Sequence, residues 1–110
     1  FSAPSRAQLP VIEELLERYS GQGLEVFGIG VDGEPLRTRL RQLAREEGLS
    51  FSVLLDPATK DDGFALSLAY GVRGTPTLYV IDRDGKVAFV GVGWTSEAAL
   101  DDAVRKASAP

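Results

Sequence analysis

Residues 24–32, with the sequence L-E-V-F-G-I-G-V-D, form a near-continuous apolar run, which is the strongest indication of fold in this chain. A half-exposed strand alternates apolar and polar residues, whereas an apolar run without alternation is typical of a strand buried on both faces. Such strands occur mainly in parallel sheets with helices on both sides. We therefore expect a strand at 24–32 in the interior of an α/β protein.

The rest of the chain alternates between helix and strand patterns. A helix is expected at 4–20, where apolar residues recur at three- and four-residue spacing; Ser2 or Ser5 can cap it, and Pro10 lies inside it. Further helices are expected at 35–47, 62–70 and 96–107, and strands at 51–56, 77–82 and 86–90. The last two strands flank an Asp-Gly turn and predict a hairpin. This alternation predicts a layered α/β fold.

Composition excludes several kinds of chemistry. The 110 residues carry 12 basic and 16 acidic side chains, a net charge of −4, with no basic patch for nucleic acid. The absence of Cys and His excludes disulfide exchange, Cys/His zinc sites and histidine acid–base catalysis within these residues. Asp61 and Asp62 alone are poor evidence for a cation site, and a loop is the better interpretation. We expect no metal, no cofactor and no nucleic-acid partner.

The segment Ser2–Pro10 reads S-A-P-S-R-A-Q-L-P. With cysteine at both serine positions it resembles the redox motif C-x-P-C-R-A-E-L-P of bacterial TlpA/ResA-type thioredoxin-like proteins. In that motif the first thiol sits at a helix N-terminus, where the helix dipole and free N–H groups stabilise the nucleophilic thiolate. A serine hydroxyl forms no disulfide. The resemblance therefore implies that Ser2 and Ser5 occupy the two catalytic cysteine positions of an oxidoreductase.

A second motif lies at 70–85, where Y-G-V-R-G-T-P-T precedes the expected hairpin. It resembles the family pattern Y-G-V-x-G-T-P-T followed by F/Y-L-I-D-x-x-G. In that family the proline is cis and lies against the redox pair, and backbone groups beside it hold an extended substrate peptide. The resemblance implies that Thr75–Pro76 is a cis bond and that Thr75 and Pro76 form a substrate-side ledge. Without the resemblance, a proline that begins a strand would be the better interpretation.

The resemblance covers almost the whole chain and implies a thioredoxin-like fold, with a central mixed sheet flanked by helices. We expect a single domain over residues 1–110 that is N-terminally incomplete. In the family, a central strand ends in F-W-A-x-W and enters the redox motif, and Phe1 matches its end. That strand lies between the strands expected at 24–31 and 77–82, so without it the sheet would have two unpaired inner edges. In an alternative register, residues 1–5 match F-W-A-x-W and the redox tetrapeptide is absent.

Three further residues have a functional and a plain interpretation. Glu34 and Asp32 follow the strand at 24–32, and ResA-like proteins place a glutamate near there that tunes cysteine protonation. Acidic residues before a helix are more often caps or first-turn charges. Glu34 is kept as a modulating residue, while packing is preferred for Trp94 over a place in the site.

The first functional hypothesis is a TlpA/ResA-type thiol–disulfide oxidoreductase domain in a cysteine-less, redox-inactive form. The alternative is a natural thioredoxin-like peptide-binding module that lost its redox pair. A peroxiredoxin ranks third, because it needs a peroxidatic cysteine that this chain lacks. The resemblance implies a protein thiol or disulfide substrate and an extracytoplasmic location, periplasmic or membrane-anchored, with any anchor upstream of Phe1.

Overall fold

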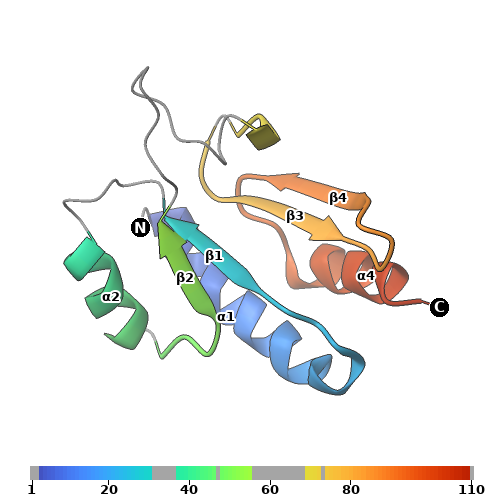
Figure 1. Cartoon of the computed structure of the whole chain (residues 1–110), viewed down its shortest axis with the longest axis horizontal. Helices are drawn as coiled ribbons and strands as arrows, with labels where there is room; N and C mark the ends of the chain where they lie inside the picture. Colours follow the sequence, from blue (N-terminus) through green and yellow to red (C-terminus); the bar gives the residue numbers. More distant parts are fainter. Residues whose placement is uncertain (1–2, 31–36, 47, 56–68, 73, 110) are drawn as a thin grey trace. The chain divides into compact units, whose positions relative to one another are not determined.

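A computed structural model describes residues 3–30, 37–46, 48–55, 69–72 and 74–109 (Figure 1). The chain divides into two compact units. We call Glu25–Arg73 the parallel unit, and Ser2–Leu24 with Gly74–Pro110 the hairpin unit.

The parallel unit consists of two strands and one helix. Strand β1 (Phe27–Gly30) pairs in parallel with β2 (Ser52–Leu55), in the register Phe27 to Ser52 and Gly30 to Leu55. Helix α2 (Arg37–Glu46) lies between them in sequence. It ends in two hydrogen bonds, Gly48 N to Arg45 O and Leu49 N to Ala44 O, with Gly48 at φ +64°. This is a Schellman ending, and the positive φ explains the glycine.

The parallel pairing expected from the apolar run is confirmed, but burial of β1 on both faces is wrong. Phe27 is 60% exposed and Ile29 is 40% exposed. Their neighbour across the sheet, Leu54, is 49% exposed. Alternate residues of a strand point to opposite faces, so the exposed residues share one face of the pair. Continuous apolar character therefore did not mean that both faces are covered in the described residues.

The hairpin unit begins with α1 (Ala3–Arg18) and the short helix η1 (Ser20–Gln22). Strands β3 (Thr77–Ile81) and β4 (Val87–Val92) pair antiparallel, with a bulge where Val80 pairs Phe89 and Ile81 pairs Val87. Helix α4 (Glu97–Ala107) follows, capped by the Ser96 side chain, which accepts from Ala99 N. The helices expected at 4–20 and 96–107 and the hairpin are confirmed.

The hairpin turn is organised by one carboxylate. Asp82 Oδ1 accepts from the backbone N–H groups of Asp84 and Lys86, at 2.9 and 3.0 Å. Asp82 N also donates to Lys86 O, and Gly85 adopts φ +80°. A short acidic side chain that binds backbone N–H groups two and four residues ahead closes such a turn locally. The sequence D-R-D-G-K therefore ends β3 and begins β4.

One core holds the hairpin unit together. Its buried residues are Leu15 and Tyr19 of the N-terminal segment and Leu100 and Val104 of α4. The hairpin contributes partly buried residues from one face, namely Leu78, Val80 and Phe89. Both helices therefore pack against the same face of the hairpin.

Strand pairing within the described residues is limited to two separate pairs, β1 with β2 and β3 with β4. None of the described strands pairs with both β1 and β3, so the joining strand remains a prediction. The helix expected at 62–70 lies outside the described residues except for its end at Ala69 and Tyr70. In the described part of the chain, every helix is too short or too polar to cross a membrane.

Candidate functional site

The first turn of α1 carries one of the two predicted cysteine-equivalent positions. Ser5 is the third residue of α1 and is half-buried. Ser5 is therefore not the cap of this helix, as one of our two alternatives proposed. Ser2 lies outside the described residues. A group in the first turn of a helix is close to unpaired backbone N–H groups and the positive end of the dipole, which favours negative charge there.

The second predicted element lies immediately before β3. The Thr75–Pro76 bond is cis, as the sequence predicted. Pro76 is buried and Thr75 is exposed. The Thr77 hydroxyl donates to the Gly74 carbonyl, and Pro76 O accepts from Gly93 N at 2.9 Å. These contacts join the segment around Thr75 to the start of β3 and to the end of β4.

A third element, Gln8, was not predicted from the sequence. It lies on α1, its side chain is among the most completely buried in the described chain, and it is 1% exposed. Gln8 Nε2 donates to Thr95 O at 3.0 Å, and Gln8 Oε1 accepts from Thr95 N at 2.7 Å. One amide thus satisfies both backbone groups of Thr95, which are themselves buried.

A sequence signal for Gln8 was available. Gln8 precedes Ile12 by four residues and Leu15 by seven, so it lies on the apolar stripe of the predicted helix. A polar side chain on a buried stripe must have a hydrogen-bond partner. The pattern could have identified Gln8 as a paired polar residue, although it does not identify Thr95 as the partner.

These contacts bring three segments of the hairpin unit together. Ser5 precedes Gln8 by three residues and therefore lies on the same face of α1, one turn nearer the N-terminus. Gln8 holds Thr95, and Pro76 holds Gly93. The first turn of α1, the Thr75–Pro76 ledge and the segment Gly93–Thr95 thus form one candidate site.

Trp94 lies between the two anchored residues of that segment, and our preference for a packed Trp94 is wrong. Its side chain is 54% exposed. The backbone on either side is held by Pro76 and Gln8, whereas the indole itself remains largely open to solvent. An exposed tryptophan on a fixed backbone is a feature of binding surfaces rather than of cores.

The remaining predicted acidic residues are not placed by this structure. Glu34, Asp32, Asp61 and Asp62 all lie outside the described residues. Among the residues that are described, no three Cys, His, Asp or Glu side chains gather as a metal site would require.

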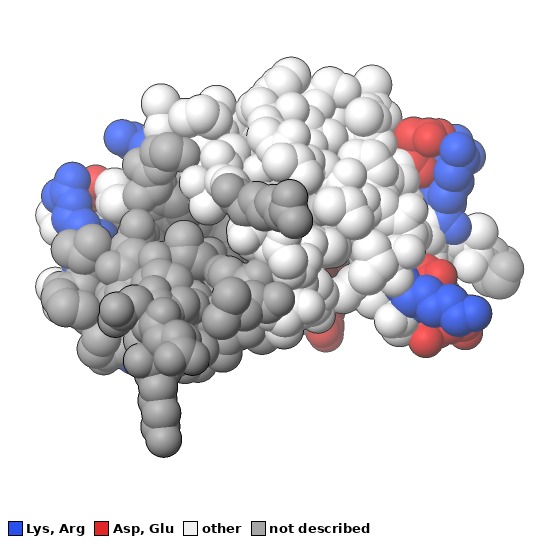
Figure 2. All heavy atoms as spheres, turned by 90° about the horizontal axis from the view of Figure 1, so that it is seen from above, with Lys and Arg blue, Asp and Glu red and all other residues white. Residues whose placement is uncertain are grey.

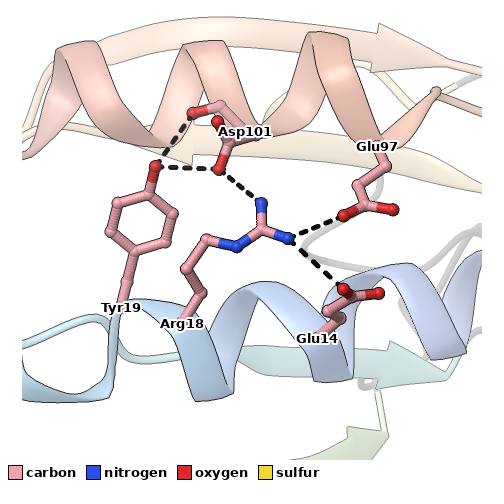
Figure 3. Close-up of polar contacts among 5 residues, drawn as sticks. All are labelled: Glu14, Arg18, Tyr19, Glu97 and Asp101. Carbon is pink, nitrogen blue, oxygen red and sulfur yellow. Dashed lines mark hydrogen bonds and ion pairs between the residues drawn. The ribbon is translucent and has the colours of Figure 1, made fainter.

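A second polar cluster joins α1 to α4 (Figure 3). Arg18 Nη1 donates to Asp101 Oδ1 at 2.8 Å, and Arg18 Nη2 donates to Glu97 at 2.8 Å and to Glu14 at 3.3 Å. The Tyr19 hydroxyl donates to the same Asp101 oxygen at 2.8 Å. We call these five residues the α1–α4 clamp.

The clamp perturbs the groups that form it. The hydrogen bond from Arg18, followed by that from Tyr19, lowers the pKa of Asp101. The hydrogen bond from Tyr19 to Asp101 raises the pKa of Tyr19. The hydrogen bonds from Arg18 to Asp101 and Glu97 raise the pKa of Arg18. Arg18 follows Ser5 by thirteen positions along α1, which is about 20 Å at 1.5 Å per residue. The clamp is therefore a structural contact and not part of the candidate site.

The model of the AhpC/TSA family matches residues 1–90. This chain belongs to the AhpC/TSA family. It is similar to the thiol-disulfide oxidoreductase ResA of Bacillus anthracis, with 29% identity over 94% of this chain and 56% of that protein. ResA of Geobacillus thermodenitrificans is 33% identical over 76% of this chain and 44% of its own length. The chain spans about half the length of the curated relatives it matches.

Solved structures give the fold of this AhpC/TSA-family chain. A putative thiol:disulfide interchange protein DsbE from Chlorobium tepidum superposes with a TM-score of 0.82 at 25% identity, covering 98% of this chain and 73% of that one. A thiol-disulfide isomerase from Corynebacterium glutamicum has a TM-score of 0.84 at 18% identity, with coverage of 98% and 75%, and supports the fold alone. The predicted thioredoxin-like fold is confirmed, and the chain is related to thiol-disulfide oxidoreductases.

Proposed function

We propose that this chain is a TlpA/ResA-type thiol–disulfide oxidoreductase domain in a redox-inactive form, which binds an extended protein segment without exchanging disulfides with it. The observation that carries the proposal is the candidate site itself. Ser5 lies one turn before Gln8, which binds Thr95, and Gly93 of the same segment binds Pro76 of the cis bond. The chain has no cysteine.

The chemistry follows from the side chains at this site. Thiol–disulfide exchange needs a thiolate that attacks one sulfur of the substrate disulfide, releases the other as a thiolate, and is itself released by a second thiol. A serine hydroxyl at position 2 or 5 has no accessible anion comparable to a thiolate and forms no S–S bond. The steps left to this chain are recognition and binding of the substrate.

The partner that fits this proposal is a protein thiol or disulfide substrate, held by Thr75 and Pro76 beside the positions of Ser2 and Ser5. Glu34 remains a proposed modulating residue. The similarity to ResA and DsbE proteins supports a periplasmic or membrane-anchored, extracytoplasmic location. With 12 basic and 16 acidic residues the chain is not suited to bind nucleic acid.

Restoration of the two thiols tests the proposal. In an insulin-reduction assay with dithiothreitol, the parent chain should not exceed the uncatalysed rate. The double variant S2C/S5C, made in a protein that also carries the expected upstream strand, should accelerate the reaction and interconvert between dithiol and disulfide. The matched control is S2C alone, which should form a mixed disulfide that only dithiothreitol can release, and should therefore accelerate the reaction less than the double variant does.

Two results would contradict the proposal. One is insulin reduction by the cysteine-free parent chain. The other is a double variant that keeps the parent's circular dichroism spectrum yet never forms an intramolecular disulfide. The alternative of a natural peptide-binding module predicts the same behaviour for the chain and differs in the gene, which would then carry serine codons at positions 2 and 5.

A further inference from the structure

We propose that Trp94 is a specificity-determining residue that takes an aromatic or large aliphatic side chain of the bound segment, and that Gln8 is the positioning residue that keeps Trp94 in place. This inference rests on the proposed function, because it names the chemistry of the segment that the candidate site binds.

The first step concerns the position of Trp94. Gly93 N donates to Pro76 O at 2.9 Å, and β4 pairs with β3 up to Val92 and Thr77. Consecutive Cα atoms are about 3.8 Å apart. Trp94 directly follows Gly93, and Thr75 directly precedes Pro76. Trp94 and Thr75 are therefore each next to a residue of the Gly93–Pro76 hydrogen bond. An extended segment on the Thr75–Pro76 ledge therefore passes close to Trp94.

The second step concerns how that position is held. A loop between a strand and a helix would ordinarily move, and an indole on a mobile backbone would lose much of its affinity in becoming ordered. Here Gln8 binds both backbone groups of Thr95 from a side chain that is 1% exposed. With Pro76 holding Gly93, the backbone on both sides of Trp94 is fixed before any ligand arrives. The backbone that carries the indole is thus preorganised, and the indole itself is exposed.

The third step concerns the chemistry of the surface. The segments 74–77 and 91–96 contain no charged residue. Val92, at the end of β4, is 73% exposed beside the 54% exposed Trp94. In Figure 2 the described surface between the two ends of the view is largely white, and acidic and basic side chains lie at both the left-hand and the right-hand end. An uncharged surface with one large aromatic group favours an apolar side chain over a charged one.

The test uses the full chain and two fluorescein-labelled, extended nonapeptides that differ only at the central position, phenylalanine in one and alanine in the other. Fluorescence anisotropy gives both dissociation constants, and their ratio is the aromatic preference. The parent chain should prefer the phenylalanine peptide by about tenfold or more. W94A should bind both peptides equally, with W94F between the two.

Variants of Gln8 separate positioning from simple stability. Q8A should reduce the aromatic preference while Trp94 is still present. Q8E should reduce it at least as much, because a carboxylate cannot donate to Thr95 O and would place a charge at a 1% exposed position. In the free protein, Q8A should also lower the fluorescence anisotropy of Trp94, the single tryptophan. The matched control is Y70A, which removes a 44% exposed aromatic residue of the parallel unit and should leave the preference unchanged.

Failure of this inference is distinguishable from failure of the proposed function. Equal aromatic preference in W94A and the parent chain would overturn the role of Trp94, while a redox-active S2C/S5C protein would leave the proposed function intact. An unchanged preference in folded Q8A would overturn the positioning role of Gln8. If the unmodified chain binds none of the three ligands, namely the two nonapeptides and a carboxymethylated insulin B chain, both proposals are overturned.

Discussion

The hairpin unit and the parallel unit differ in how much of their apolar surface is covered. In the hairpin unit, Leu15 is 2% exposed, and it packs with Tyr19, Leu100 and Val104. In the parallel unit, Phe27 and other strand residues remain substantially exposed, and among the described residues Leu43 of α2 is the buried apolar side chain. A buried apolar core therefore stabilises the hairpin unit. The parallel unit relies more on the backbone hydrogen bonds between β1 and β2, whose sheet has one exposed apolar face.

The difference bears on where the candidate site lies. Every site residue that the structure describes belongs to the hairpin unit, namely Ser5, Gln8, Thr75, Pro76 and Trp94. A binding site needs fixed backbone, and fixed backbone needs long-range contacts. The hydrogen bonds between Gln8 and Thr95 join residues 87 positions apart and supply such a contact. The two units should therefore differ in stability as their packing implies.

The largest effect is expected in the core of the hairpin unit. Leu15→Ala removes a side chain that is 2% exposed and should destabilise the protein by about 2–5 kcal/mol, from lost burial and the cavity left behind. The matched variant Leu54→Ala, at a 49% exposed position of β2, should cost less than about 1 kcal/mol. Urea unfolding followed by circular dichroism measures both. Equal losses would mean that the two units are equally well packed.

The next largest loss of stability is expected from replacing a glycine at one turn in each unit. Gly85 at φ +80° and Gly48 at φ +64° both have open space where a Cβ would stand, so alanine meets only backbone strain. That strain is about 1–2 kcal/mol for a residue in the left-handed region. Native-state hydrogen exchange should show Gly85→Ala accelerating exchange in the hairpin unit and Gly48→Ala accelerating it in the parallel unit. Uniform acceleration by either variant would show that the units open together.

A smaller effect is expected at the start of α4. The Ser96 hydroxyl accepts from Ala99 N at 3.2 Å, and its loss in Ser96→Ala should cost about 1 kcal/mol. Ser20→Ala, on an exposed residue of η1, serves as the control and should change stability by less than half as much. Thermal unfolding of the two variants side by side makes the comparison. A Ser96→Ala protein as stable as the Ser20→Ala control would show that the Ser96 cap does not stabilise α4.

The smallest effect is a pH dependence from the α1–α4 clamp. Folding lowers the pKa of Asp101, so the native state favours the charged carboxylate. Its contribution is fully present above the usual aspartate pKa of about 3.9 and is lost as the pH falls through the lowered pKa. Asp101→Asn should therefore flatten the acid limb of stability against pH. If stability falls equally with decreasing pH in the unmodified chain and in Asp101→Asn, the clamp does not favour the charged form of Asp101.

Local signals in the sequence predicted much of the fold. The Asp-Gly turn of the hairpin and helices near 35–47 and 96–107 were predicted. The structure shows why, because Ser96, Gly48 and Gly85 each act on backbone within a few residues. The resemblance at 70–85 also predicted the cis Thr75–Pro76 bond. Glu34 and Ser2 lie outside the described residues, so their predicted roles remain predictions.

Tertiary structure decided what the local signals could not. Helical spacing places Gln8 on a buried stripe, but only the folded chain brings Thr95 to it. Apolar character predicted a packed Trp94 and a buried β1, yet exposure depends on what other segments cover, and Trp94 and Phe27 remain open. The sequence by itself determined the turns, the helix ends and the hairpin, because those forces act over neighbouring residues. The fold decided which side chains meet across the chain and which remain available for a partner.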